Sequence, residues 1–393
     1  MRRVQSSKAA ILVFLQGAMF WTASTAAIGF FPLLTVALQL SALEAGLFLA
    51  GAALGRTVFQ PCAGLIIRPG NAGRYYVTGL GCCLVSSIVM ACFHQASWVI
   101  LARLAGGVGL SLFVVSWRTV LNRMAGLPCF DAVNESHVLS QNVGRLIGPA
   151  LGGILVTCFG IQAAFIFPAL LYSLCLLTSS LGQGPTQSES SRTEQVSLKF
   201  TTRIRDIRKQ GGILLVHHVE FFCLGLWLAG WPICAVAGHR LSAEQLGYSF
   251  TIAAAGGLAL FLVRPWTSKL SVQTRLILAL TLLGAQPGAA LLTSDWSLLL
   301  CLSFLVGGLG GSIYFTSFHR LLADTYSPEQ IPFIYGMLGS STFLCQAIGQ
   351  AITPFLSGYL SPKAPIILDA VMLLGCFIFL ALNFLVAWLR MSR

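Results

Sequence analysis

Twelve long apolar segments, separated by short polar loops, account for most of this 393-residue chain. Each segment is roughly 20 or more residues long, which is the length that a helix needs to cross the hydrocarbon core of a bilayer. Because lipid offers no partner to an unpaired backbone N–H or C=O group, we expect each segment to be an α-helix. The expected spans are residues 10–38, 43–67, 75–93, 98–121, 134–159, 162–181, 212–237, 244–263, 275–293, 296–322, 332–360 and 365–389.

The composition excludes a soluble globular protein. Hydrophobic residues make up 56% of the chain and charged residues only 9%, whereas about a quarter of the residues of a soluble domain are charged. The loops leave no room for an ATPase domain, and no G-x4-GK[ST] phosphate-binding loop occurs. We therefore expect no cofactor and no ATPase subunit, with energy supplied by a proton or solute gradient.

The net charge of +12 reports the orientation of the chain in the membrane. Only Arg240 and Lys363 lie in one set of alternate loops. The other set and the termini hold Arg2, Arg3, Lys8, Arg68, Arg74, Arg118, Arg123, the run from Arg192 to Lys209, Lys269, Arg275, Arg320, Arg390 and Arg393. Positive residues gather on the cytoplasmic side of membrane proteins. This pattern predicts cytoplasmic termini and a retained first helix, and it does not indicate a nucleic-acid partner.

The twelve cysteines are scattered through the apolar segments without a C-x-x-C pair. Small polarizable side chains of this kind are typical of packing positions. We expect no metal site.

A long hydrophilic segment divides the chain into halves that repeat each other. It predicts an N-terminal six-helix bundle at 1–181, a cytoplasmic linker at 182–211 and a C-terminal six-helix bundle at 212–393. Leu40-Ser41-Ala42 recurs at Leu241, and the GGVGLSLFVVSW block at Gly106 recurs as GGLGGSIYFTSF at Gly307, both with an offset of 201 residues. With an even number of helices in each half, the repeat is parallel, about an axis along the membrane normal.

The stretch SQNVGRLIGPALGGIL carries the most specific pattern. Gly144, Gly148 and Gly152 recur every four residues, so on a helix they form a bare stripe that admits another backbone at close range. Pro149 and Gly153 lie beside this stripe, and we expect them to kink the helix. Such a helix suits a hinge or seal between two moving bodies.

The pattern G-x3-GP-x2-GG in that stretch resembles the fifth-helix signature of proton-coupled exporters in the major facilitator superfamily. Arg103-x-x-Gly106-Gly107 resembles the superfamily's R-x-x-q-G pattern, and GLIIRPGNAGR resembles its loop between helices two and three, without the usual aspartate. AVNESHVLSQNVGRLIGPALGG is most similar to the bacterial enterobactin-exporter group. The resemblance implies the two-bundle major facilitator fold, a multi-pass protein of the bacterial inner membrane, and a central cavity lined by helices one, four, seven and ten.

Few ionisable residues lie in the expected spans, and their charge is mainly positive. Arg145, Arg103 and Arg56 lie in the first half, whose first helix has no Asp or Glu. The resemblance implies a carboxylate in the first helix of exporters of cationic drugs, so its absence here disfavours a cationic substrate. Guanidinium groups pair well with carboxylates and catecholates. The predicted substrate-binding residues are Arg145, Arg103, Gln141, Asn142, Trp21 and Tyr314. The alternative is structural: the arginines clamp neighbouring helices, and the aromatic residues only fill space.

His217, His218 and Glu220 form the densest titratable group in an apolar segment. Groups that titrate near the working pH suit proton coupling, so we predict these three as the coupling residues. The alternative is that the histidines face lipid headgroups and that Glu220 pairs with an arginine.

The leading interpretation is a secondary transporter, not an enzyme, that exports a small siderophore-like anion in exchange for protons across the lipid bilayer. Alternatives are a multidrug efflux antiporter, an importer of a siderophore or metabolite and, in another class, a membrane-embedded enzyme or receptor.

Overall fold

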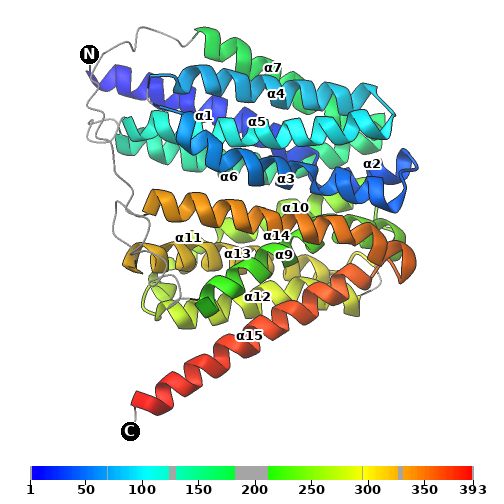
Figure 1. Ribbon diagram of the computed structural model, residues 1–393, viewed down its shortest axis with the longest axis vertical. Coiled ribbons are helices and arrows are strands. Elements are labelled where there is room, and N and C mark those ends of the chain that lie inside the picture. Colours follow the sequence, from blue (N-terminus) through cyan, green and yellow to red (C-terminus); the bar gives the residue numbers. More distant parts are fainter. Residues whose placement is uncertain are drawn as a thin grey trace.

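The computed structural model describes residues 2–68, 70–123, 130–181, 211–293, 295–325 and 331–391, and the regular elements in these ranges are helical. Figure 1 shows the helices running side by side, with both chain ends at the same end of the molecule. The helices are α1 (Arg2–Ala26), α2 (Phe31–Ala37), α3 (Ala42–Ile66), α4 (Ala72–Cys92), α5 (Ala96–Arg123), α6 (Phe130–Phe159), α7 (Ala163–Leu181), α9 (Gly211–Ile233), the π-helix η1 (Cys234–Gly238), α10 (Ala243–Leu258), α11 (Leu260–Thr267), α12 (Val272–Leu292), α13 (Leu298–Thr325), α14 (Ile331–Tyr359) and α15 (Ala364–Met391).

The predicted all-α membrane fold class is confirmed. Each of the twelve expected spans coincides with a helix or with two successive helices. Within the described ranges, nine spans are individually long and apolar enough to cross a membrane, and the pair α1–α2 makes a tenth. The segments expected at 162–181 and 332–360 correspond to α7 and α14.

The first span is not the single helix expected over residues 10–38. It breaks after Ala26 and resumes at Phe31, and the two pieces are bent by 43°. Pro32, the second residue of that piece, cannot donate a backbone hydrogen bond to the turn before it. Gly29 in the break lies against the ring of Phe250 from α10, where a larger residue would collide. The break therefore brings the backbone at Gly29 into close contact with α10 of the opposite half.

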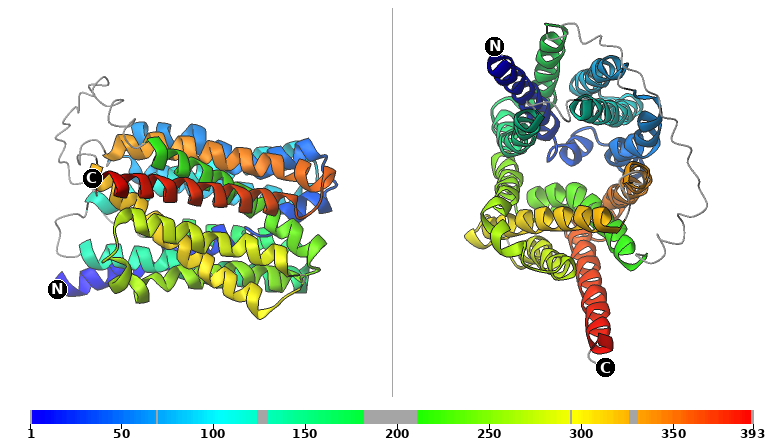
Figure 2. Two further views of the ribbon diagram at one scale, coloured as in Figure 1. Left: turned by 90° about the horizontal axis from the view of Figure 1, so that it is seen from below. Right: turned by 90° about the vertical axis from the view of Figure 1, so that its left-hand side faces the viewer.

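Helices of the two repeats gather in separate groups when the molecule is viewed along them (Figure 2). In the first group α1 packs on α6 and α7, and α5 packs on α3 and α4. In the second group α9 packs on α14 and α15, and α13 packs on α10 and α12. Contacts between the groups come mainly from α3 with α14 and α6 with α10. The predicted linker lies outside the described residues except for Gly211, and the boundaries 1–181, 182–211 and 212–393 stay a prediction.

The glycine stripe of α6 admits a backbone at close range, but that backbone belongs to the same half. A Cβ added at Gly144 or Gly148 would overlap the α1 backbone at Thr22, and one at Gly152 would overlap the carbonyl of Ala26. The stripe therefore packs α6 against α1 within the first half. It does not lie at the contact between the two halves, where a hinge or seal was expected. α6 also continues through Pro149 as one helix.

The contact between halves uses the neighbouring face of α6. A Cβ at Gly247 of α10 would overlap the carbonyl oxygen of Pro149, and Gly153 faces Ala243 and Gly247. At the matching position of the repeat, Gly46 of α3 faces the carbonyl oxygen of Ala351 on α14. The repeated Leu-Ser-Ala blocks begin these two helices, where Ser41 and Ser242 each form a capping box. The repeat thus places one glycine contact on each side of the interface.

Candidate functional site

A cavity of 150 Å³ lies between the two halves. Arg56 of α3 and Arg103 of α5 enter it from the first half, and Gln346 and Gln350 of α14 enter it from the second. A second cavity of 70 Å³ shares Arg103 and Phe31 with the first and extends into the first half toward Tyr172. The lining therefore combines two cationic groups, two amides and apolar walls, which is the usual make-up of a small-molecule site.

Glycine contacts bring the two arginines to this cavity. Gly51 and Gly55 of α3 lie directly against α5, and the stem of Arg103 is within 3.1 Å of where a Cβ of Gly51 would be. Gly107 of α5 in turn faces the carbonyl of Ala52. Because the two helices approach so closely, Arg56, which directly follows Gly55, and Arg103, one turn before Gly107, can share one space.

The guanidinium groups of the arginines in the first half lie over aromatic rings. The Cζ atom of Arg103 is 3.5 Å from the ring centroid of Phe31 on α2, and that of Arg56 is 3.6 Å from the ring centroid of Phe343 on α14. Arg145 lies over Trp21 of α1 at 5.3 Å. Stacking satisfies the face of a guanidinium group and leaves its N–H edge available to an anion.

None of these arginines is paired with a carboxylate in the part of the chain that the structure describes, where the one ion pair joins Arg320 and Asp324. The Nε atoms of Arg56 and Arg103 are buried and have no hydrogen-bond partner. Arg118 and Arg145 also lie within electrostatic range of Arg56. The centre of the molecule therefore concentrates positive charge that its described residues do not neutralise.

The predicted substrate residues on α6 lie at the edge of this region. Arg145 is exposed and lies within electrostatic range of Arg56. Gln141 is half-buried and its amide nitrogen is 2.9 Å from Nε2 of His137. Asn142 is half-buried beside it, and the indole nitrogen of Trp21 is buried without a partner. Arg145 and Trp21 are thus brought together, whereas Gln141 is engaged by His137.

Tyr314, His217 and His218 lie in the interior of the second half. The Tyr314 hydroxyl is 3.4 Å from Nδ1 of His217, whose ring stacks on Phe318 at 3.6 Å. His218 is bound at both ring nitrogens, by the Leu214 carbonyl at 2.7 Å and the Ser341 hydroxyl at 2.8 Å. The three side chains are not among the residues that line the central cavity, and their predicted roles stay predictions.

Glu220 lies about one turn after His217 on α9. It lines a cavity of 50 Å³ with Asp369 of α15 and Gln286 of α12. Both carboxyl groups turn into the second half, so neither pairs with Arg145. The expected alternative in which Glu220 pairs with an arginine is therefore not met among the described residues.

Sequence reasoning missed several residues that line the central cavity. Gln346 was visible as the repeat partner of Gln141, so comparison of the two halves could have indicated it. Phe31 and Phe343 had no such signal, because a phenylalanine in an apolar span is indistinguishable from any other packing residue. Their contact with arginine depends on how α2 and α14 are placed.

Helices of membrane-spanning length throughout the described ranges, with a cavity between two groups of them lined by arginines and amides, are the architecture of a transporter of small solutes. The chain belongs to the Major Facilitator Superfamily, whose family model matches residues 11–285 and 237–390. It is a multi-pass transporter and not an enzyme. No curated protein matches the sequence at a significant level.

Solved structures share the fold at low sequence identity. The human organic anion transporter MFSD10 (TETRAN) is 16% identical, with a TM-score of 0.64, and the match covers 95% of this chain and 99% of that one. The nucleoside transporter NupG is 14% identical, with a TM-score of 0.71 and 98% of both chains covered. Its D323A mutant is 12% identical with a TM-score of 0.72, covering 96% of this chain and 99% of the other.

Proposed function

We propose that this protein is a secondary active transporter of small organic anions, with Arg56, Arg103 and Arg145 as the groups that attract and hold the substrate. The observation that carries the proposal is the pair Arg56 and Arg103, which line one cavity with aromatic rings on their faces and no described carboxylate at their edges. A buried cation without a counter-charge is costly. An anionic substrate would supply that charge during transport.

The substrate class that fits best is a carboxylate or catecholate with an apolar ring. Such a molecule offers paired oxygens to a guanidinium fork and an apolar body to the walls of the cavity. The amides of Gln346 and Gln350 would add neutral hydrogen bonds to hydroxyl groups. Specifically, we propose that the protein exports a siderophore-like anion and that protons drive this export. One protein of similar fold is an organic anion transporter, and its substrates would carry the same sign of charge.

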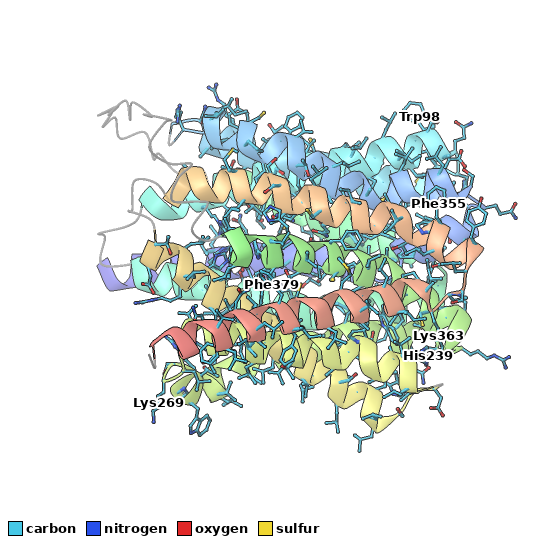
Figure 3. The ribbon with its side chains drawn as sticks, turned by 60° about the horizontal axis from the view of Figure 1, so that its bottom comes forward. Trp98, His239, Lys269, Phe355, Lys363 and Phe379 are labelled. Atoms are coloured by element: carbon cyan, nitrogen blue, oxygen red, sulfur yellow. The ribbon has the colours of Figure 1, made fainter. Side chains whose placement is uncertain are left out.

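The proposed setting is the bacterial inner membrane with both termini in the cytoplasm. Support comes from the alternate-loop distribution of Arg and Lys. In the structure Lys269 and Lys363, assigned to opposite sides, lie at opposite ends of the helices (Figure 3). Glu220 is proposed to carry the coupled proton.

Transport by the purified protein in liposomes tests the anion proposal. Radiolabelled 2,3-dihydroxybenzoate is the anionic probe, uridine the neutral probe and tetraphenylphosphonium the cationic probe. The expected result is saturable uptake of the anion alone, stimulated when the vesicle interior is acidic. Uptake of uridine or tetraphenylphosphonium without uptake of the anion would refute the proposal and favour a nucleoside or multidrug substrate instead.

The coupling residue is tested by Glu220→Gln in the same vesicles. The amide resembles the protonated acid but cannot titrate, so accumulation against a gradient should be lost while downhill exchange continues. An unchanged response to the pH gradient would return Glu220 to a structural role.

A further inference from the structure

Glu220 and Asp369 bring two carboxyl groups into one small buried cavity. They come from α9 and α15, and the side chains are only 5% and 2% exposed. Oε2 of Glu220 and Oδ1 of Asp369 are buried and have no hydrogen-bond partner. Buried polar atoms are nearly always paired in proteins, so two orphaned carboxylate oxygens lining one cavity indicate a ligand that the structure does not contain.

The third wall of the cavity adds further oxygen donors. Gln286 of α12 contributes a side-chain amide, and Pro287 follows it. Because proline has no backbone N–H, the carbonyl of Leu283, one turn earlier, loses its helical donor. Leu283 and Pro287 both line the cavity. Carboxylate, amide and free carbonyl oxygens are the ligands of hard cations.

The charges around the cavity are negative or neutral. The other titratable groups near Glu220 or Asp369 are Tyr314 on α13, Cys223 and His217 on α9, and Cys376 on α15. No arginine or lysine lines the cavity. Two ionised carboxylates that share a buried space repel each other, so they need positive charge from outside the protein.

We propose that this cavity is a binding site for one monovalent metal cation, Na⁺, for which protons compete. The volume of 50 Å³ exceeds the ~10–15 Å³ that a single water-sized occupant needs. Among the described residues no group of three or more His, Cys, Asp or Glu side chains could hold a metal ion, so the protein charge at this cavity comes from the two carboxylates alone. Two carboxylates with neutral oxygen donors suit a single positive charge. The site would couple an ion gradient to the anion transport proposed above, on which this role rests.

Thermal unfolding of the purified protein, without any organic anion, tests the site. NaCl replaces choline chloride at constant ionic strength, at pH 8 and at pH 5.5. Na⁺ that binds only the folded protein should raise Tm in proportion to the logarithm of its concentration once that exceeds the Kd, by about 2 °C when it is tenfold above the Kd. The rise should be smaller at pH 5.5, because protons then occupy the carboxylates. A Tm that responds to pH but not to Na⁺ would show a site for protons alone and would overturn the proposal.

Variants assign the effect to the two carboxylates. Glu220→Gln and Asp369→Asn keep side-chain shape and should each abolish the Na⁺-dependent rise. Asp324→Asn is the matched control, since Asp324 is an exposed carboxylate paired with Arg320, and it should keep the full response. If Glu220→Gln or Asp369→Asn retains the Na⁺-dependent rise in Tm, the cation binds elsewhere and the proposed site is wrong. The wild-type comparison stands even if a variant fails to fold. Because no anion is present, loss of the Na⁺ effect leaves the arginine site untouched.

Discussion

The guanidinium carbon of Arg103 on α5 lies 3.5 Å from the ring centroid of Phe31 on α2. Phe31 is the first residue after the break in the first span, so the break carries its ring to the cavity. The ring covers one face of the guanidinium group, and both residues line the cavity between the halves. This pair makes Arg103 the most informative residue for testing anion binding.

Replacing Arg103 by lysine keeps the charge but removes the planar fork and the stacking on Phe31. One charge-assisted hydrogen bond contributes about 1.5–3 kcal/mol, so the Kd for 2,3-dihydroxybenzoate should rise about 10- to 100-fold. Equilibrium binding to detergent-solubilised protein measures it. Arg68→Lys, at an exposed arginine outside the cavity, is the control. Equal affinity in Arg103→Lys and wild type would place the substrate elsewhere.

Arg145 is expected to act on the substrate and not on stability. It is exposed, lies over Trp21 and has no carboxylate partner among the described residues. Arg145→Ala should therefore change the unfolding free energy by no more than about 1 kcal/mol, the value of an exposed cation–π contact, while anion affinity falls. Thermal unfolding with and without the anion separates the two effects. A large loss of Tm in both conditions would mean that Arg145 is structural.

Larger residues at Gly148 and at Gly247 should impair the protein in different ways. Gly148→Leu forces a side chain into the α1 backbone within one half, so overpacking should lower stability by about 1–3 kcal/mol. Gly247→Ala instead puts a methyl group on the Pro149 carbonyl across the halves, so it should separate α6 from α10 and reduce transport. Gly64→Ala, where a Cβ meets nothing within 4 Å, is the control for both. Normal transport by Gly247→Ala would show that this contact is not part of the cycle.

His239 should make stability depend on pH. It follows the last membrane turn of the π-helix, and burial, then the positive charge of Lys363, lowers its pKa below the ordinary value of 6.5. The unfolded chain therefore takes up the proton more readily, so the stability is complete above about pH 6.5 and is lost as the pH falls. Between pH 7.5 and 5.5, Tm should fall less in His239→Gln than in wild type. The exposed His94→Gln should behave as wild type; an unchanged slope in His239→Gln would contradict the assignment.

The proposed orientation predicts which loops are reached from outside the cell. In a background without the native cysteines, Lys363→Cys should react with an impermeant maleimide in intact cells, and Lys269→Cys should react only after the membrane is opened. The two residues lie at opposite ends of the molecule (Figure 3). Labelling of position 269 alone in intact cells would mean that the protein has the opposite orientation. Labelling of both positions in intact cells would contradict the number of membrane spans between residues 269 and 363.

The sequence alone determined the class of protein, because its strongest signals are local. Apolar length requires membrane helices wherever it occurs, and the repeated Leu-Ser-Ala and GG blocks act through capping and close helix contact on either half. The stripe at Gly144, Gly148 and Gly152 likewise predicted a close backbone neighbour. Arg103 and Arg145 stood out because any ionisable residue in a membrane span needs a partner.

Only the tertiary structure decided what those partners are. The sequence could not show that the stripe faces α1, or that Gly153 and Gly247 make the contact between the halves, because both faces of α6 are rich in small residues. The same holds for Phe31 and Phe343 over the arginines, and for Asp369 beside Glu220, which are 149 positions apart in the chain. Charge and hydropathy are properties of single residues, whereas a site is a property of which helix faces meet, and that is settled by packing across the whole bundle.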